Sequence, residues 1–590
     1  MNDEIGSEYD VIMLGSGLPG AVLAGIIARM GLKILVIEKG SHPRFAIGEA
    51  MLPQSTMWLD LLSERFDYPE IQDIISVENI QKKISRNCGH KRSISFLYHE
   101  EGKKQDQKHQ SHQVVAPETP FSSESHFVRA DIDHHMLKNA IKAGVTYIDN
   151  TNAVDFDCKE NDVTVTIDSG DKFHGKLLLD GAGFMSPLAK KFGLRKEATE
   201  IRSTSRTLFT HADGLKHYDK LDGVQQPFQR YGYHDGTVHH IFKGGWFWVI
   251  PFDNAPGSEN TGASIGLSLD TTVYPKDDNV SPDDEFWSFV NKFPTVKDHF
   301  ENLVFTRPLI STGRLQYSSN KSAGPGYCLL SHAAGFMDAI MSRGMINSFE
   351  STYYICRALE KAMAAGNFNY EHFESLNAMH DAQLDITDRL VKTYYDSTQD
   401  FRLWNAWFNL WFGGKILGDL YFIGAVVKAK QGNFEFFSRC DQHVRADASA
   451  PYAPYLEELV ALVESTQAAV KSGDMTIQEA ADSVCDKVKL AEWLPHDTYN
   501  WGGPAGNCNF DEEVFRQMCI DWGQHTAPDY IRDKVLNYTA PWIPNNKAAI
   551  EELNKIKEHQ MKRTERLAKR GIVVPEMIDP TGLGDVALSA

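Results

Sequence analysis

Three glycines near the N-terminus have the spacing of a dinucleotide-binding turn. Gly15, Gly17 and Gly20 follow a short apolar segment and begin an Ala- and Ile-rich stretch that ends at Met30. In such a turn the glycines let the backbone approach a pyrophosphate, which the amino end of the next helix binds. Glu38 lies about 20 residues further on, where a carboxylate accepts hydrogen bonds from a ribose and repels a 2′-phosphate. These residues predict a site for FAD or NAD, and not for NADP.

A second glycine-rich segment, residues 502–506, is the other place where such a turn could form. No apolar strand precedes it, so it does not predict a nicotinamide site. We therefore expect one nucleotide site, with reducing equivalents supplied from outside the chain.

Two pairs of residues have spacings that fit either chemistry or ordinary structure. Trp246 and Trp248 stand two apart on a predicted strand, so both indoles lie on one face. They form a wall beside a site, or they pack in the core. Arg129 and Asp133 stand four apart at the start of a predicted helix over residues 130–143, where a surface ion pair is the usual explanation.

Other residues favour structure over chemistry. Lys91 precedes an alternating segment, and an exposed lysine is its ordinary interpretation. Residues 262–266 match Gly-x-Ser-x-Gly, but they lie inside an alternating strand and not at the strand-to-helix turn of a hydrolase. The spacing of five histidines does not fit a metal site: His109, His112, His126, His134 and His135. Three tryptophans recur at helical spacing and predict either core packing or a cover over a substrate: Trp404, Trp407 and Trp411.

The elements that must position these residues are those of an α/β protein. A strand, turn, helix and strand over residues 11–37 begin the chain, and strands at 163–167 and 177–180 follow. Residues 207–269 alternate between turns, which predicts an antiparallel sheet inserted into this framework. From about residue 350 onward the apolar spacing is mostly helical.

Composition and charge exclude several classes of protein. The chain has 590 residues, 42% of them hydrophobic, and a net charge of −19, so its field repels nucleic acids and acidic membranes. Its most apolar stretch, residues 404–427, contains Asn, Lys and Asp, which predicts a buried helix and not a membrane span. Eight scattered cysteines without a CxxC pair predict reduced thiols in the cytoplasm.

Two polar segments predict surface structure. Residues 100–125 lack a clear period and predict a long surface excursion. Residues 555–570 form a basic, amphipathic pattern that is most often a solvated helix face. Neither segment indicates a function by itself.

Two segments together carry a resemblance to a known family. The first is the loop Pro-Arg-Phe-Ala-Ile-Gly-Glu at residues 43–49, and the second is Trp-Phe-Trp-Val-Ile-Pro at residues 246–251. With them the chain resembles the flavin-dependent halogenases, whose signature is Trp-x-Trp-x-Ile-Pro. The resemblance runs through residues 41–45, 124–126, 244–252, 314–319 and 401–404. It extends to about residue 430 and fades beyond it.

The resemblance implies the roles of individual residues. Lys91, in a Gly-x-Lys-Arg context, matches the essential lysine, which hydrogen-bonds hypohalous acid or is converted to a haloamine; Lys82 and Lys83 are reserve candidates. A wall between flavin and substrate is formed by Trp246, Trp248, Ile250 and Pro251. The implied cofactor-binding residues are Gly15, Gly17, Gly20, Glu38, Arg44, Ile47, Gly48, Arg129, Asp338, Ser342 and Gly344. Backbone amides near residues 342–344 form the implied halide site, and Ala339 stands where relatives usually carry proline.

The resemblance also implies the fold and its division. We expect a fold of the α/β (α+β) class, a Rossmann-like FAD-binding fold of the aromatic-hydroxylase and halogenase type. Residues 1–385 would form the FAD-binding core, with an inserted substrate-side sheet at about residues 200–320. Residues 386–590 would form a mainly helical region that covers the substrate site.

We therefore predict an FADH₂-dependent halogenase, an oxidoreductase that places chlorine or bromine on an electron-rich pyrrole, indole or phenol-type small molecule. It would use FAD as FADH₂, O₂, and chloride or bromide, with electrons from a separate flavin reductase. The alternatives are an FAD-dependent monooxygenase that hydroxylates and a non-catalytic flavin-binding homologue. We expect a cytoplasmic monomer or homodimer with no nucleic-acid partner, no membrane span and no metal.

Overall fold

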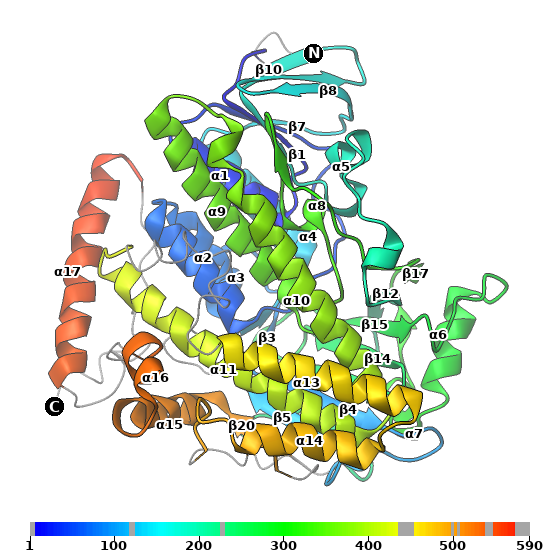
Figure 1. The fold of residues 1–590 in the computed structure, drawn as a ribbon. Helices are drawn as coiled ribbons and strands as arrows, with labels where there is room; N and C mark the ends of the chain where they lie inside the picture. Colours follow the sequence, from blue (N-terminus) through cyan, green and yellow to red (C-terminus); the bar gives the residue numbers. More distant parts are fainter. Residues whose placement is uncertain are drawn as a thin grey trace.

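A computed structural model describes residues 6–116, 124–224, 230–434, 453–496, 501–503, 508–536 and 547–572. A six-stranded, mostly parallel sheet lies near the N-terminus, and a nine-stranded sheet lies at the opposite end of the molecule (Figure 1). Long helices cross from one sheet to the other and cover both on one side (Figure 1). The site described below lies where these two parts meet.

The strands are β1 (Val11–Leu14), β2 (Ile34–Ile37), β3 (Gly89–Lys91), β4 (Ser93–His99), β5 (Ser111–Val115), β6 (Glu124–His126), β7 (Thr146–Ile148), β8 (Ala153–Lys159), β9 (Asp162–Ile167), β10 (Lys172–Gly175), β11 (Leu177–Asp180), β12 (Ser205–Asp213), β13 (Thr237–Phe242), β14 (Gly245–Pro251), β15 (Ala263–Asp270), β16 (Val304–Phe305), β17 (Ile310–Ser311), β18 (Ala323–Gly324), β19 (Tyr327–Leu329) and β20 (Cys508–Asp511). The helices are α1 (Leu18–Arg29), α2 (Pro53–Arg65), α3 (Val77–Lys83), α4 (Arg129–Lys142), α5 (Pro187–Lys191), α6 (Pro282–Val290), α7 (Pro294–His299), α8 (Ser331–Ala334), α9 (Arg343–Ala365), α10 (Ser375–Ser397), α11 (Phe401–Lys430), α13 (Ala453–Ser472), α14 (Ile477–Lys489), α15 (Glu512–His525), α16 (Asp529–Lys534) and α17 (Lys547–Lys569).

The predicted strand, turn, helix and strand at the N-terminus are confirmed as β1, α1 and β2. The six-stranded sheet has the order β18-β19-β11-β1-β2-β7, and β1 pairs in parallel with both β2 and β11. Val11 and Met13 belong to the core under the helices, whereas Ile12 and Leu14 belong to the core on the opposite face. Because both faces of β1 are buried, its sequence is continuously apolar and does not alternate.

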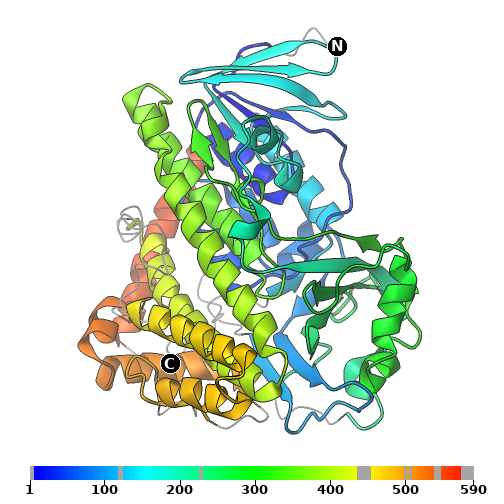
Figure 2. The same cartoon turned by 45° about the vertical axis from the view of Figure 1, so that its right-hand side comes forward.

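The predicted antiparallel sheet is confirmed, and it is larger than residues 207–269. Strands β12, β15, β14 and β13 form its antiparallel centre, and β4 joins β13 in parallel (Figure 2). Strand β5 continues the sheet beyond β4, and β20 pairs with β5. The sheet therefore draws strands from three distant parts of the sequence.

The prediction of one surface excursion over residues 100–125 is wrong for residues 111–115 and 124–125, which lie in buried strands. Residues 111–115 form the buried strand β5. This polar strand can be buried because its side chains have partners: His112 Nε2 lies 3.0 Å from Asn405 Oδ1, and Ser111 Oγ donates to the carbonyl of Gln107 over 2.5 Å. Residues 117–123 lie outside the described residues.

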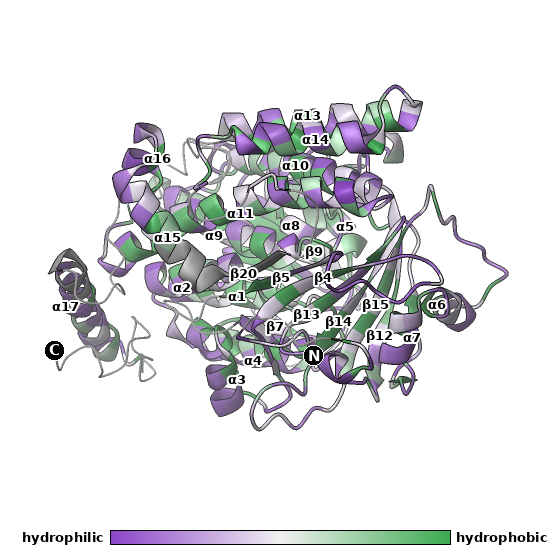
Figure 3. Cartoon of the chain, turned by 90° about the horizontal axis from the view of Figure 1, so that it is seen from below, coloured by the Kyte–Doolittle hydropathy of each residue, from purple (hydrophilic) through white to green (hydrophobic). Residues whose placement is uncertain are grey.

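The predicted buried helix over residues 404–427 is confirmed as α11. Helix α11 is the one described helix with the length and apolar composition of a membrane span, and 78% of its most apolar window is buried inside the fold. From below, α11 lies among other helices beside the nine-stranded sheet (Figure 3). It is therefore a core helix. The predicted division of the chain after residue 385 stays a prediction, and that position falls inside α10.

The basic helix predicted over residues 555–570 is α17, at the edge of the molecule (Figure 3). It is not solvated on all sides. The side chain of Arg563 is only 4% exposed and donates to the carbonyl of Ser63 over 2.7 Å, and Arg566 and Arg570 pair with Asp67. One face of α17 thus docks on α2.

Candidate active site

The glycine turn after β1 has the geometry that its sequence predicts. Gly15 has a φ of +89°, and a Cβ atom added there would lie 2.9 Å from the carbonyl oxygen of Gly181. A Cβ atom on Gly20 would lie 2.8 Å from the carbonyl oxygen of Gly15. Gly17 faces Arg44, whose Nη2 would lie 3.6 Å from an added Cβ. The turn leaves the amino end of α1 accessible to a bound phosphate.

Glu38 stands at the end of β2 beside this turn. Its carboxylate accepts hydrogen bonds from the backbone N–H of Ser16 over 2.8 Å and of Gly40 over 3.0 Å. Burial alone would raise the pKa of Glu38, but these N–H groups and the charge of Arg44 hold that pKa below its ordinary value. The carboxylate is therefore ionised and fixed where a ribose would bind. Gly15, Glu38 and Arg44 line one open cleft.

A second cavity, of about 830 Å³, brings together residues that are far apart in the sequence. We call it the flavin cavity, because residues that the family resemblance implies for flavin binding line it. Eight of the predicted cofactor-binding and wall residues line it, and so does Ala339, which follows the predicted Asp338. The eight are Ile47, Gly48, Arg129, Trp246, Trp248, Ile250, Ser342 and Gly344. The two tryptophans therefore face the same space as the predicted halide loop.

Arg129 begins α4 at the edge of the flavin cavity. Its guanidinium binds the Asp133 carboxylate in a two-pronged pair, at 2.7 and 2.9 Å, and donates to the carbonyl of Ile47 over 2.6 Å. Burial would lower the pKa of Arg129, but Asp133 holds it above its ordinary value. The expected ion pair thus exists, and it also fixes the loop over residues 43–49.

Both indole N–H groups of the tryptophan wall donate hydrogen bonds to neighbouring side chains. Trp246 Nε1 donates to the Tyr395 hydroxyl over 3.2 Å, and Trp248 Nε1 donates to Ser264 Oγ over 3.4 Å. Any Cβ atom on Gly266 would lie 2.1 Å from the Trp248 ring. The segment that resembled a nucleophile elbow is therefore part of β15, as its alternation predicts, and supports Trp248.

Two predicted residues lie near the flavin cavity without lining it. The carboxylate of Asp338 accepts hydrogen bonds from Ser205 Oγ over 2.5 Å, the Tyr395 hydroxyl over 3.1 Å and the Ile340 N–H over 3.0 Å. Burial raises the pKa of Asp338 against these bonds. Pro251 ends β14, and its carbonyl oxygen lies 2.8 Å from His126 Nδ1. Direct cofactor contact by Asp338 therefore stays a prediction.

Lys91 is buried and not exposed as its local sequence alone suggests. It ends β3, and its side chain is 1% exposed. Its Nζ donates to the carbonyl oxygen of Met51 over 2.6 Å and lies 3.8 Å from Glu124 Oε2. Glu124 stands directly opposite Lys91 in the antiparallel β3–β6 pair. The reserve candidates Lys82 and Lys83 are exposed at the end of α3.

The imidazole beside Lys91 is neutral. His126 Nε2 lies 2.8 Å from Thr237 Oγ1, and burial together with the charge of Lys91 holds the pKa of His126 well below its usual range. The Glu124 carboxylate and the Met51 carbonyl, and not this imidazole, are therefore the groups that stabilise an ammonium at Lys91.

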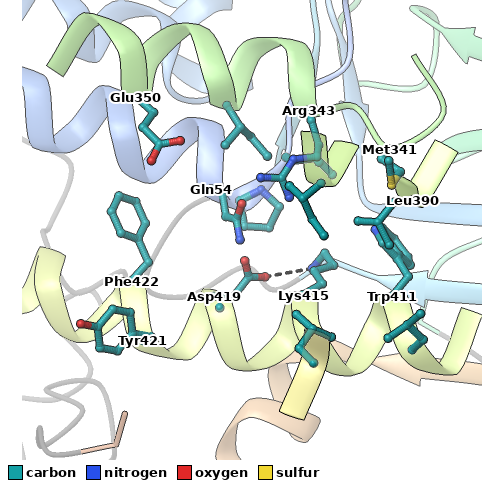
Figure 4. Close-up of a pocket in the computed structure, with 18 of the residues that line it drawn as sticks. Gln54, Met341, Arg343, Glu350, Leu390, Trp411, Lys415, Asp419, Tyr421 and Phe422 are labelled. Atoms are coloured by element: carbon teal, nitrogen blue, oxygen red, sulfur yellow. Dashed lines mark hydrogen bonds and ion pairs between the residues drawn. The ribbon is translucent and has the colours of Figure 1, made fainter. Parts of the chain in front are cut away.

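A third space is a pocket of about 120 Å³, shown in Figure 4. We call it the ring pocket. Residues 47–50 line the flavin cavity, and residues 52–54 line the ring pocket. Similarly, Ser342 lines the flavin cavity, and its neighbours Met341 and Arg343 line the ring pocket. The segments at residues 47–54 and 341–343 thus separate the two spaces. Lys91 is hydrogen-bonded to the first of these segments, at Met51.

The ring pocket lies between α2, α9, α10, α11 and α13. Its walls are largely apolar and include the rings of Trp58, Trp411 and Phe422. Five polar side chains also line it: Gln54, Arg343, Glu350, Lys415 and Asp419. Core packing is confirmed for Trp404 and Trp407, whereas Trp411 lines the pocket, and a cover over a substrate stays a prediction.

Sequence reasoning missed the partners of Lys91 and the polar residues of the ring pocket. Glu124 lay in a segment that matched the family, but only strand pairing brings it opposite Lys91. Lys415 and Asp419 have the spacing of a helical ion pair within an otherwise apolar helix, which is the signal that could have singled them out.

The site residues fit FAD. The turn at Gly15 has no room for a side chain, Glu38 is ionised beside that turn, and the tryptophan wall lines the flavin cavity. A family model for the tryptophan halogenases matches residues 80–439. The chain belongs to this family and is a flavin-dependent halogenase, with FAD as its cofactor.

Particular relatives extend the match beyond the family model. The chain is 37% identical over 487 residues to monodechloroaminopyrrolnitrin halogenase PrnC of Pseudomonas fluorescens, covering 81% of this chain and 84% of that protein. It is 33% identical to tetracycline 7-halogenase of Kitasatospora aureofaciens, covering 82% and 87%. The crystal structure of halogenase PltM in complex with phloroglucinol and FAD superposes with a TM-score of 0.76 at 29% identity, over 82% of this chain and 96% of that one. The predicted Rossmann-like FAD-binding fold and the halogenase activity are confirmed.

Proposed function

We propose that this halogenase places chlorine or bromine on a small, electron-rich ring bound in the ring pocket, and that Lys91 directs the halogen to it. One observation carries the proposal: Lys91 binds Met51, the residue between the linings of the flavin cavity and the ring pocket. Because Met51 lies between the two sets of lining residues, a molecule that moves from the flavin cavity to the ring pocket past Met51 would come close to the Lys91 ammonium.

FAD, when reduced and bound, supplies hypohalous acid from O₂ and a halide. The remaining chemistry is electrophilic substitution. A ring carbon gives an electron pair to the halogen, the oxygen–halogen bond breaks, and the departing hydroxide becomes water with the proton that the same carbon loses. An ammonium at Lys91 would hydrogen-bond the oxygen of hypohalous acid, stabilise its negative charge as that bond breaks, and orient the halogen toward the ring.

The partners of the Lys91 side chain favour this hydrogen-bonding role over a haloamine. Glu124 lies 3.8 Å from Nζ and compensates a positive charge there, and the Met51 carbonyl accepts one of the ammonium N–H groups. A haloamine requires the neutral amine, which these two partners stabilise less.

The size of the ring pocket supports a single-ring substrate. Its volume is about 120 Å³, and a protein cavity of roughly 150 Å³ holds benzene. PltM, whose solved complex contains phloroglucinol, a trihydroxybenzene, is a relative with such a ligand. Pyrroles and phenols therefore fit the pocket better than fused ring systems.

We also infer that a separate flavin reductase supplies reduced FAD, since the sequence contains one glycine turn of the dinucleotide-binding type. The cytoplasm suits the protein, because the cysteines Cys88, Cys158, Cys328, Cys356, Cys485 and Cys519 are free thiols.

The test combines purified protein, FAD, a flavin reductase, NADH and bromide with pyrrole, phenol, indole and 2-naphthol, and identifies products by mass spectrometry. We expect bromide-dependent products that are more abundant from the single rings than from the fused ones. Products that carry oxygen in place of bromine would support a hydroxylase and contradict the proposal. The Lys91→Ala variant should bind FAD and lose the products, and Lys82→Ala, at an exposed lysine, should keep them.

A further inference from the structure

We propose that Asp419, oriented by Lys415, accepts a hydrogen bond from a ring hydroxyl or ring N–H of the substrate and so selects phenols and N–H heterocycles over their alkylated forms. This inference rests on the proposed binding of the substrate in the ring pocket and names the chemical group that the pocket recognises.

The Lys415–Asp419 pair is unusual for its position in the fold. Lys415 Nζ lies 2.9 Å from Asp419 Oδ2, and the two side chains are 10% and 0% exposed. The pair stands on α11, whose other buried residues are almost all apolar or aromatic. Removing two charges from water at such a place is unfavourable, and well-packed apolar residues are often as stable.

Helix stability does not explain the pair either. In an exposed helix a carboxylate four residues before a lysine is favourable, whereas here the lysine comes first, which is the weaker orientation. A buried pair that stability does not require is a candidate for binding.

The geometry directs Asp419 to a ligand. Figure 4 shows Lys415 and Asp419 projecting from α11 toward Gln54 and Arg343, which come from the opposite side of the ring pocket. Glu350, the other carboxylate of the pocket, is hydrogen-bonded by Gln383. Asp419 is thus the carboxylate that faces the centre of the pocket and is oriented by a neighbouring cation.

The charges of the ring pocket balance. Arg343 and Lys415 are cations, and Glu350 and Asp419 are anions. A neutral ligand therefore fits better than an anion or a cation. A neutral ring that is electron-rich enough for electrophilic attack usually carries a hydroxyl or N–H group, and either group can donate to a carboxylate.

The hydrogen bond would also assist the reaction. When the ring carbon gives its electron pair to the halogen, the ring becomes positively charged and its hydroxyl or N–H group becomes a stronger donor. A carboxylate acceptor stabilises that charge until the carbon loses its proton, and Asp419 itself need not take a proton. Charge-assisted hydrogen bonds of this kind correspond to about a 10- to 100-fold change in rate or affinity.

The test uses two matched pairs of probes, phenol with anisole and pyrrole with N-methylpyrrole. For each pair, the preference is the ratio of kcat/KM for the donor to that for its alkylated form. In Asp419→Asn we expect this preference to fall by about 10- to 100-fold. Calorimetry without turnover should show weaker binding of phenol and unchanged binding of anisole. Asp396→Asn, in the Lys392–Asp396 pair on α10 outside the ring pocket, is the matched control and should keep the wild-type preference.

A double variant keeps the test decisive if Asp419→Asn fails to fold. Lys415→Met/Asp419→Leu removes both charges and keeps an apolar, well-filled helix, so it should fold and also lose the preference. An unchanged preference in these variants, or equal losses for donor and alkylated probes, would overturn the inference. If wild-type protein brominates none of the probes, the proposed function itself is wrong. If bromination depends on Lys91 but the Asp419 variants keep the wild-type preference for donor probes, only the role of Asp419 is refuted.

Discussion

The Nζ atom of Lys91 lies 2.6 Å from the carbonyl oxygen of Met51, and this contact stands between two separate spaces. Residues just before Met51 line the flavin cavity, and residues just after it line the ring pocket. A flavin halogenase must form a reactive oxidant beside its cofactor and use it on a different molecule. Under the proposed function, Lys91 acts in the second step, when the oxidant leaves the flavin cavity and reacts with the ring.

The conformation of Gly15 predicts a selective loss of FAD binding. Gly15 and Gly31 both have a φ of +89°, but only at Gly15 would a Cβ atom meet the backbone, 2.9 Å from Gly181 O, whereas at Gly31 no described atom lies within 4 Å. Gly15→Ala should weaken FAD binding by at least about 10-fold, and Gly31→Ala should only lower stability by about 1 kcal/mol. Flavin fluorescence titration measures the first effect and urea unfolding the second. Equal FAD affinity in both variants would contradict the predicted turn.

Tyr395 links the tryptophan wall to the loop that follows Asp338. Its hydroxyl accepts from Trp246 Nε1 over 3.2 Å and donates to Asp338 Oδ2 over 3.1 Å, and Asp338 in turn binds the N–H of Ile340. We expect Tyr395→Phe to lower the free energy of unfolding by about 1–2 kcal/mol. We also expect it to raise the KM for bromide, because this loop leads into the predicted halide site at residues 342–344.

The neighbouring Tyr394 provides the control for this prediction. Its buried hydroxyl has no hydrogen-bond partner among the residues that the structure describes. Tyr394→Phe should therefore change the free energy of unfolding by less than about 0.5 kcal/mol. It should leave the KM for bromide unchanged. If both tyrosine variants behave alike, Tyr395 has no specific role in holding the loop.

Three buried histidines predict how stability depends on pH. His99, His240 and His299 form a chain with N···N distances of 2.9 and 3.0 Å. Burial lowers the pKa of His99 to about 3 and holds the pKa values of His240 and His299 well below their usual range. As the pH falls below about 6.5, the unfolded chain binds protons that the folded chain does not, so the free energy of unfolding falls by up to about 1.4 kcal/mol per histidine and pH unit.

Urea unfolding between about pH 7.5 and about pH 5 measures this dependence. His240→Leu should show a shallower slope than wild type, whereas His109→Asn, at an exposed imidazole, should show the same slope. A wild-type stability that stays constant over this range would contradict the assignment of neutral, buried imidazoles.

The sequence predicts those features that depend on neighbouring residues. The apolar strand, the glycines and Glu38 lie within one short segment, so the nucleotide site follows from local spacing. Trp246 and Trp248 likewise share a face because of strand geometry alone. The burial of Lys91 does not follow from its surroundings in the chain, since it depends on pairing with Glu124 across β3 and β6.

Long-range packing also explains the other differences. Residues 111–113 are polar and predict surface structure, yet they are buried, and Asn405 on α11 supplies a partner for His112. The ring pocket combines residues of α2, α9 and α11, which are far apart in the sequence, so no local pattern could predict it. Resemblance to the family indicated the lysine and the wall, but not what surrounds them.

The most direct test of the central claim follows where the bromine goes. The assay compares wild type with Lys91→Met and with Lys91→Met/Glu124→Gln. The double variant has no uncompensated carboxylate. Each protein is given reduced FAD, bromide and phenol, together with a soluble trap for hypobromite. We predict that both variants bind FAD and form hypobromite as wild type does, that bromophenol falls by at least about 100-fold, and that the missing bromine appears in the trap. Bromophenol formation that persists without Lys91, or hypobromite formation that stops with it, would contradict the role of Lys91 at the boundary between flavin cavity and ring pocket.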